Sequence, residues 1–328
     1  RCTAPCGAAV LVIVAAADAS ERRMCVKRVL RWSGMVLIGL AGVLVLAGAV
    51  VYALSARRLQ RVHVVTIVAP GAIPTDPGAY ERGRHIATAM GSCALCHGAD
   101  LGGQLLGPEG PIGTLAAPNL TRGRGGLGAS FTDADWVRAI RNGVHRDGTT
   151  FLVMPSEAFV YMNEPDTAAL IAYLERMPPV DREMPRSRLG PLGRTLLVLG
   201  RFSILTAEKT PALRYPEVID PGPTAAYGRY LANFMGCHGC HGFGLSGGPV
   251  AGPPNTPPAS NLTPDPQTGI PHWTEADFVH AVRQGVRPDG RPIDTFMPWP
   301  YFAGLTDVEV SALWQYVRSV PPKPYGNK

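Results

Sequence analysis

A Cys-x-x-Cys-His motif occurs twice in this chain of 328 residues, at Cys93–His97 and at Cys237–His241. This spacing is typical of covalent haem attachment, in which the two thiols form thioethers with the haem vinyl groups and the histidine reaches the iron. Two copies therefore predict two covalently bound c-type haems. The expected attachment residues are Cys93, Cys96, Cys237 and Cys240, and the expected proximal iron ligands are His97 and His241.

The two motifs lie in an internal repeat, because the region from Tyr80 to Pro179 recurs as Tyr227 to Pro322. Within it, residues 131–148 align with residues 273–290 without a gap and are identical at ten of 18 positions. Apolar residues at helical spacing and sparse strand signals predict three short helices in each copy, and hence a mainly α fold with two tandem domains. The expected first helices cover about 79–92 and 224–236, the second run from Thr132 to Gly143 and from Thr274 to Gly285, and the third follow Pro165 and Thr306.

Haem iron has a sixth coordination position, and Met154 and Met297 are the best candidates to fill it. They follow the first cysteine of their motifs by 61 and 60 residues, and each precedes a proline that stiffens the loop. The alternative, that these methionines only fill the core, is disfavoured because both repeats carry them at the same place. Three other histidines have no histidine counterpart in the sister repeat, so we expect them to be surface or packing residues: His85, His145 and His280.

Asn119 and Asn261 precede the second helices and are candidates to support the haem ligands by hydrogen bonding. Local turn formation explains them equally well. Three other uses of the cysteine pairs are disfavoured. A zinc site lacks two further ligands near each motif, a redox dithiol has no systematic histidine after it, and simple disulfides leave the Met-Pro pairs unexplained.

Residues 34–56 form an apolar run of 23 residues without a charge. At ~1.5 Å per residue, a helix over this run spans roughly 34 Å, which is enough to cross a bilayer. Basic residues flank both ends almost equally, so charge alone does not orient the helix. Covalent haem attachment takes place outside the cytoplasm, and we therefore expect residues 57–328 to be exported. A cleaved signal peptide ending near residues 47–49 is the alternative, disfavoured by the length of the run.

The segment before the run, residues 1–33, is then expected to be cytoplasmic. The chain begins with Arg, whereas Met24 opens a conventional leader, so residues 1–23 are interpreted as upstream translation. Nine of the 31 basic residues but only two of the 25 acidic ones lie in residues 1–61. The net charge of +6 therefore marks a membrane flank and gives no support for nucleic-acid binding. The cysteines outside the motifs should stay reduced thiols on the cytoplasmic side: Cys2, Cys6 and Cys25.

The predicted domains are an anchor at 34–56, a first haem domain at 75–180, a linker at 181–221 and a second haem domain at 222–325. The linker contains a short apolar piece, Leu196–Leu199. This piece is too short to be a second membrane span, and we expect it to pack against a domain.

The segment NLTPDPQTGIPHWTEADFVHAVRQGVRPDG, followed by FMPWPYF, resembles the matching part of the multihaem cytochrome c subunits of membrane-bound alcohol and gluconate dehydrogenases. The resemblance covers residues 75–325, and its most specific parts are the haem motifs, the Asn-Leu-Thr loops and the Met-Pro pairs. It implies His97/Met154 and His241/Met297 as axial pairs, and electron transfer from a dehydrogenase towards quinone or a terminal oxidase. Those subunits commonly carry three haem motifs, whereas this chain has two.

Together these observations predict a dihaem cytochrome c anchored in the bacterial inner membrane, with its haem domains in the periplasm and no catalysis of its own. It would carry electrons between a periplasmic or membrane dehydrogenase and the respiratory chain. Two alternatives remain, namely the dihaem electron-entry subunit of a terminal oxidase and a dihaem cytochrome c peroxidase. A peroxidase needs one iron with an open or displaceable sixth position, which two matched Met-Pro sites disfavour.

Overall fold

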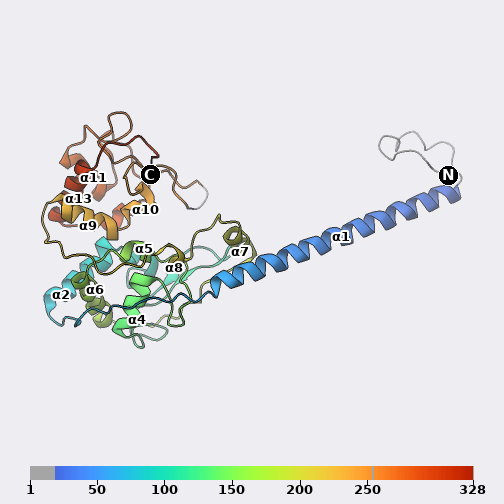
Figure 1. Ribbon diagram of the computed structural model, residues 1–328, viewed down its shortest axis with the longest axis horizontal. Helices are drawn as coiled ribbons and strands as arrows, with labels where there is room; N and C mark the ends of the chain where they lie inside the picture. Colours follow the sequence, from blue (N-terminus) through green and yellow to red (C-terminus); the bar gives the residue numbers. More distant parts are fainter. Residues whose placement is uncertain (1–18, 253–254, 328) are drawn as a thin grey trace. The chain divides into compact units, whose positions relative to one another are not determined.

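The computed structural model describes residues 19–252 and 255–327 and is mainly helical, as the sequence predicts (Figure 1). The chain divides into two compact units, one ending at Ala56 and the other beginning at Arg57. Both repeats belong to the second unit and share one hydrophobic core. Cys2 and Cys6 lie outside the described residues, and the expectations for them stay predictions.

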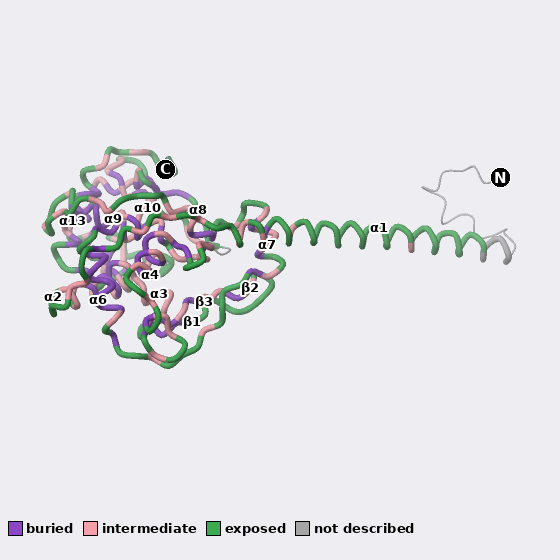
Figure 2. The backbone as a smooth tube through the Cα atoms, turned by 60° about the horizontal axis from the view of Figure 1, so that its bottom comes forward, coloured by how far each residue is buried: buried purple, intermediate pink, exposed green. Residues whose placement is uncertain are grey.

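The longest element is α1, Ala19–Leu59, with 41 residues. Its stretch Met24–Leu59 is long and apolar enough to cross a membrane, and none of its most apolar window is buried (Figure 2). The helix extends beyond the predicted 34–56 at both ends because the flanking Arg, Lys, Leu and Met residues are good helix formers. Length and composition therefore agree with an anchor or a signal sequence.

Each repeat contains the three predicted helices, a short helix over the haem motif and another after the Met-Pro pair. The first repeat contains α2 (Pro77–His85), η1 (Ile86–Met90), α3 (Cys93–His97), α4 (Asp133–Val137), η2 (Arg138–Asn142), α5 (Ser156–Phe159) and α6 (Glu164–Arg176). The second repeat contains α9 (Ala225–Phe234), α10 (Cys237–His241), α11 (Glu275–Gln284), α12 (Trp299–Phe302) and α13 (Asp307–Ser319). The threonines predicted to begin the second helices, Thr132 and Thr274, both form capping boxes.

The first helix of the first repeat ends in a π-helical turn, η1, where the second repeat has a regular helix. The first repeat has one residue more, Ser92, between its Met-Gly pair and its haem motif. A π-turn accommodates one extra residue within a helix, so the insertion is absorbed before the motif begins. Ser92 (φ 48°) and Gly236 (φ 78°) then take the same left-handed conformation directly before the first motif cysteine.

The first and last helices of each repeat cross at a glycine. A Cβ at Gly83 of α2 would lie 2.0 Å from the carbonyl oxygen of Ala169 in α6, and a Cβ at Gly228 of α9 would lie 1.9 Å from that of Ala312 in α13. Any larger residue would therefore force the helices apart. The two glycines let the same close crossing form in both repeats.

The connection between the repeats is fastened to the first one by short strands. The strands are β1 (Gln104–Leu105), β2 (Gly113–Thr114), β3 (Ala116–Ala117) and β4 (Arg188–Leu189), and β1 pairs antiparallel with β3 and β2 with β4. Two further helices, α7 (Pro191–Val198) and α8 (Thr206–Lys209), follow β4. Leu197 of α7 is fully buried in a small cluster with Leu189, Ile204 and Leu205. The apolar piece of the linker therefore packs against the folded unit, as expected.

A buried polar cluster joins the two repeats; its members are Arg82, His85, Asp166, Tyr230 and Glu309. His85 Nε2 of α2 lies 2.8 Å from Glu309 Oε2 of α13, and the Tyr230 hydroxyl of α9 donates to Asp166 Oδ2 of α6 over 2.6 Å. In the alignment of the two repeats His85 corresponds to Tyr230 and Asp166 corresponds to Glu309. The two contacts are therefore equivalent, and an approximate twofold axis between the repeats would exchange one for the other. Arg82 donates to both carboxylates, over 2.8 Å to Asp166 and 3.2 Å to Glu309.

The surroundings of Glu309 lower the pKa of its carboxyl below the ordinary value. Burial raises this pKa, but hydrogen bonds from His85 and from the Thr306 N–H, together with the charges of His85 and Arg82, lower it by more. Glu309 is therefore held in its charged form across the interface between the repeats.

Candidate haem sites

The histidine of each motif is held by a backbone carbonyl behind it. His97 Nδ1 lies 2.8 Å from the carbonyl oxygen of Pro118, and His241 Nδ1 lies 2.8 Å from that of Ser260. A carbonyl only accepts, so Nδ1 carries the proton in each ring and the ring lone pair lies on Nε2. This is the tautomer that an iron ligand needs, and the same bond orients the ring. Burial lowers the pKa of His97, and the hydrogen bond to Pro118 raises it by less, so the net shift favours the neutral imidazole.

Asn119 and Asn261 support the loops that carry these carbonyls. Asn119 Nδ2 donates to the carbonyl oxygens of Val180 and Arg182, over 2.6 and 3.1 Å, while its Oδ1 accepts from the Thr121 N–H. Asn261 makes the matching bonds in the second repeat, to the Lys323 carbonyl and from the Thr263 N–H. Both asparagines are almost fully buried. They shape a turn and tie it to the segment after the last helix, so they act on the histidines only through the neighbouring residue.

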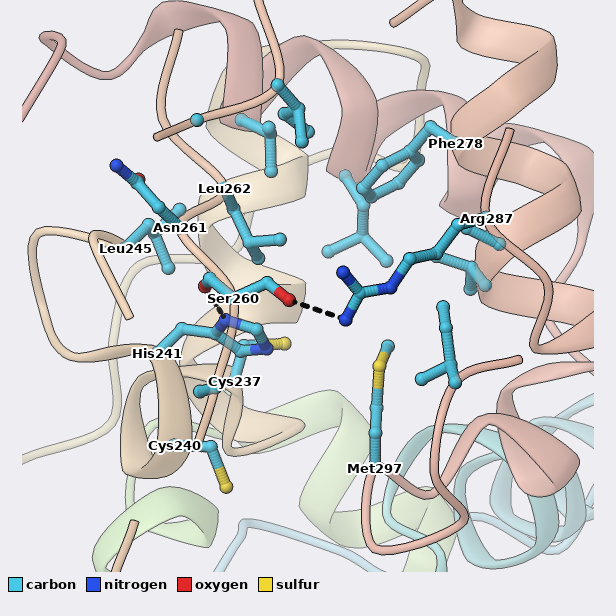
Figure 3. Close-up of a pocket in the computed structure, with 18 of the residues that line it drawn as sticks. Cys237, Cys240, His241, Leu245, Ser260, Asn261, Leu262, Phe278, Arg287 and Met297 are labelled. Carbon is cyan, nitrogen blue, oxygen red and sulfur yellow. Dashed lines mark hydrogen bonds between the residues drawn. The ribbon is translucent and has the colours of Figure 1, made fainter. Parts of the chain in front are cut away.

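A cavity of about 660 Å³ opens beside the second motif. This volume lies within the range of protein pockets that enclose a small molecule or cofactor. Figure 3 shows His241 and Cys237 on one side of the space and Met297 on another. Apolar residues form most of the remaining wall, including Leu245, Leu262 and Phe278. The cavity thus brings together four residues that the sequence assigns to the second haem: Cys237, Cys240, His241 and Met297.

Met154 and Met297 lie on equivalent loops, each leading through a proline into a short helix, α5 or α12. The Thr206 hydroxyl donates to the Met154 carbonyl over 2.8 Å, and the Trp299 N–H donates to the Met297 carbonyl over 2.7 Å. Both methionine side chains are half-buried against the shared core. These hydrogen bonds to the methionine carbonyls hold both loops in place without using the thioether sulfurs.

Polar groups at both sites suit the carboxylates of a haem. Arg287 lines the second cavity and donates from Nη2 to the Ser260 hydroxyl over 3.0 Å, beside the carbonyl that holds His241 (Figure 3). Trp136 is the first-repeat counterpart of Phe278, which also lines that cavity. Its Nε1 is buried and has no hydrogen-bond partner among the described residues. A cationic donor and an unsatisfied buried N–H are groups that a carboxylate would satisfy, so the residues present fit a haem.

The four motif cysteines are half-buried. Burial, with a smaller contribution from the second cysteine of the motif, raises the pKa of Cys93 and of Cys237 to about 12. A redox dithiol instead depends on a lowered pKa. Among residues 19–252 and 255–327, no group of three or more His, Cys, Asp or Glu side chains is placed to hold a metal ion. The raised pKa of these two thiols agrees with the rejection of a redox dithiol.

Of the three histidines expected to be surface or packing residues, two contact groups outside the haem sites. His85 belongs to the polar cluster between the repeats, and His145 packs edge-on against Phe151 with ring centroids 4.1 Å apart. His280 is exposed. The Pro118 and Ser260 carbonyls could not be predicted from residue type, because every residue carries a backbone oxygen. Their position directly before the Asn-Leu-Thr loops is the one feature of the sequence that points to them.

A motif helix, a histidine of fixed tautomer and a methionine loop, all present twice, define a c-type cytochrome with two haem domains. The cytochrome c family model matches residues 80–178 and 225–321. The chain therefore belongs to the cytochrome c family, and the predicted pair of covalently bound c-type haems is confirmed.

Relatives of known description agree with the resemblance seen in the sequence. The chain is 31% identical over 285 residues to the cytochrome c subunit of the quinone-dependent alcohol dehydrogenase of Gluconacetobacter polyoxogenes, covering 76% of this chain and 57% of the relative. It is 34% identical over 304 residues to the fructose dehydrogenase cytochrome subunit of Gluconobacter japonicus, covering 82% and 60%. It is 29% identical over 270 residues to a dihaem c-type cytochrome of Cereibacter sphaeroides, covering 74% and 86%. The chain thus spans little more than half the length of the first relative. It is an electron-transfer cytochrome, similar in sequence to the cytochrome c subunits of dehydrogenases.

Proposed function

We propose that this chain is a membrane-anchored carrier that takes electrons from a dehydrogenase and passes them to the respiratory chain, to quinone or to a terminal oxidase. His97 with Met154 would hold the iron of the first haem, and His241 with Met297 would hold the iron of the second. The observation that carries the proposal is the second cavity, which has an oriented imidazole on one wall and a methionine loop on another. The cytochrome subunits of alcohol and fructose dehydrogenases among its relatives support a dehydrogenase as the electron donor.

A haem bound at each site supplies an iron that alternates between the ferrous and ferric states. The Pro118 and Ser260 carbonyls keep each imidazole in one tautomer and orientation, and so make it a better electron donor to the metal. The methionine sulfur raises the reduction potential relative to a second nitrogen ligand. The apolar wall keeps water out, and Arg287 would hold a haem carboxylate at the cavity edge.

The apolar helix α1 supports anchoring in the bacterial inner membrane, with both haem domains on the periplasmic side, because covalent haem attachment occurs there. The domain boundaries proposed for this arrangement are an anchor at 34–56, haem domains at 75–180 and 222–325, and the linker 181–221 between them. Co-purification with a dehydrogenase would support the proposed donor. Co-purification with an oxidase core instead would favour the role of an oxidase subunit.

Spectroelectrochemical titration of the haem-loaded full chain tests the ligand assignment. Met154→Ala and Met297→Ala should each lower one of the two potentials, abolish the absorption band of one Met–ferric pair and open one iron to carbon monoxide. Met162→Leu is the matched control, since Met162 is fully buried in the core and should leave both potentials in place. Unchanged potentials in either alanine variant would remove that methionine from the ligand set. Peroxide turnover by the unmodified protein, with one Met–ferric band missing, would instead indicate a peroxidase.

A further inference from the structure

Helix α7 and Leu199, the residue directly after it, present leucine side chains to the outside although one face of the helix is packed. Leu197 is fully buried in the cluster with Leu189, Ile204 and Leu205, while Leu199 is 65% exposed and Leu192 is 42% exposed. The β2–β4 pair directly before the helix holds its start. The exposed leucines therefore stand on a fixed element, and their exposure does not arise from a loose loop.

The sequence around α7 is basic and has no acidic residue. Between Met184 and Ala207 there are four arginines and no Asp or Glu. Three of these arginines are exposed: Arg186, Arg188 and Arg201. Leucines that face outward between arginines are typical of a helix that lies on an anionic lipid surface, where the apolar side chains enter the headgroup region and the arginines contact phosphates.

The cluster beneath α7 contacts residues that directly follow the predicted membrane span, so α7 lies close to a bilayer if α1 crosses one. Leu59 packs against the Leu197 cluster, and Arg58 donates from Nη1 to the Leu197 carbonyl over 2.8 Å. Arg58 also pairs with Glu208, just after the start of α8. Leu59 follows the end of the predicted apolar run at Ala56 by three residues, which cannot span more than about 11 Å. The cluster under α7 is thus tied to the point where the chain leaves the membrane.

We propose that α7 and its flanking arginines form a second membrane contact of this protein, a surface that lies on the anionic headgroups next to the anchor. The proposal rests on the proposed membrane anchoring by α1. With this contact the haem unit has two points of attachment, the end of α1 and the leucines of α7. A single anchor would let the unit turn freely on the bilayer, whereas two points limit which of its faces meets a membrane-bound partner.

The test uses the haem-loaded full chain in liposomes of phosphatidylglycerol and phosphatidylcholine, with Cys2, Cys6 and Cys25 replaced by Ser. A nitroxide spin label is attached at one introduced cysteine, by Leu199→Cys or Leu192→Cys. Leu213→Cys is the matched control, because Leu213 is 45% exposed but lies outside the basic segment. Val45→Cys reports on the anchor itself. Power-saturation EPR then compares the accessibility of each label to oxygen, which enriches in lipid, and to a water-soluble nickel complex.

The oxygen-to-nickel accessibility ratio at positions 199 and 192 should exceed the ratio at position 213 several-fold. It should fall when Arg186→Gln, Arg188→Gln and Arg201→Gln are combined, or when phosphatidylglycerol is left out. A lipid-like ratio at position 45 with a water-like ratio at position 199 would overturn the proposal while the anchor stands. Water-like ratios at both positions would overturn the anchor as well. Shielding at position 199 that appears only at high protein-to-lipid ratio would mean that α7 docks on protein, which also overturns it.

Discussion

Tyr230 tests whether the buried polar cluster holds the two haem domains together. Its hydroxyl donates to Asp166 over 2.6 Å and accepts from the Asn163 N–H over 3.3 Å, and both carboxylate and ring are buried. Tyr230→Phe removes both bonds but keeps the ring in its place against Phe234, with centroids 5.1 Å apart. The substitution therefore isolates the hydroxyl from the packing of the aromatic ring.

The expected loss in the free energy of unfolding depends on which hydrogen bonds Asp166 and Asn163 keep in the variant. Asp166 still accepts two bonds from Arg82, so its charge stays compensated, whereas the Asn163 N–H is left without this acceptor. A hydrogen bond to a charged group contributes about 1.5–3 kcal/mol, and we expect Tyr230→Phe to lower the free energy of unfolding by about 2 kcal/mol. For a unit of this size that corresponds to a fall in Tm of about 4–8 °C.

Scanning calorimetry of the haem-loaded chain in detergent measures this change. Tyr301→Phe is the control, because Tyr301 is half-buried and its hydroxyl makes no hydrogen bond to any described residue. We expect the Tyr301 variant to stay within about 0.5 kcal/mol of the unmodified protein. Equal Tm values for the two variants would show that the Tyr230 hydroxyl does not stabilise the interface, and the reasoning would fail.

Three further outcomes are expected. Because the pKa of Glu309 is lowered in the folded state, its contribution to stability is complete above its ordinary pKa of 4.5 and is lost as the pH falls through the folded value. The Tm difference between the unmodified protein and Glu309→Gln should therefore shrink as the pH falls below 4.5, and a difference independent of pH would contradict this. Gly228→Ala would place a Cβ 1.9 Å from the Ala312 carbonyl oxygen, and we expect it to lower the free energy of unfolding in urea by about 1–3 kcal/mol or more. At the control Gly222→Ala the nearest atom is 3.8 Å away, so the free energy of unfolding should change little. Equal losses in the two variants would refute the close crossing of the helices at Gly228. Arg287→Gln should shift the potential of one haem and leave the other unchanged in a redox titration, because only the second repeat has an arginine at this position; two unchanged potentials would show that Arg287 does not act on the second haem.

The haem attachment residues and the membrane span could be predicted from the sequence, because their chemistry requires particular residue types at particular spacings. A covalent haem needs two cysteines and a histidine within five residues, and a membrane span needs a long run without charge, so both can be read along the chain. The internal repeat shows the haem motif and the Met-Pro pair twice, which strengthens both predictions. The second helix of each repeat begins after Thr132 or Thr274, as those threonines and the apolar periodicity predict.

Tertiary structure alone decided which groups surround those residues. The carbonyls of Pro118 and Ser260 hold the histidines, yet any residue type carries a carbonyl. The cluster of His85 and Glu309 joins residues 224 positions apart, and no local pattern announces a partner at that distance. Ligands follow from covalent chemistry over a few neighbouring residues, whereas the bonds that orient them and join the domains depend on how distant segments pack.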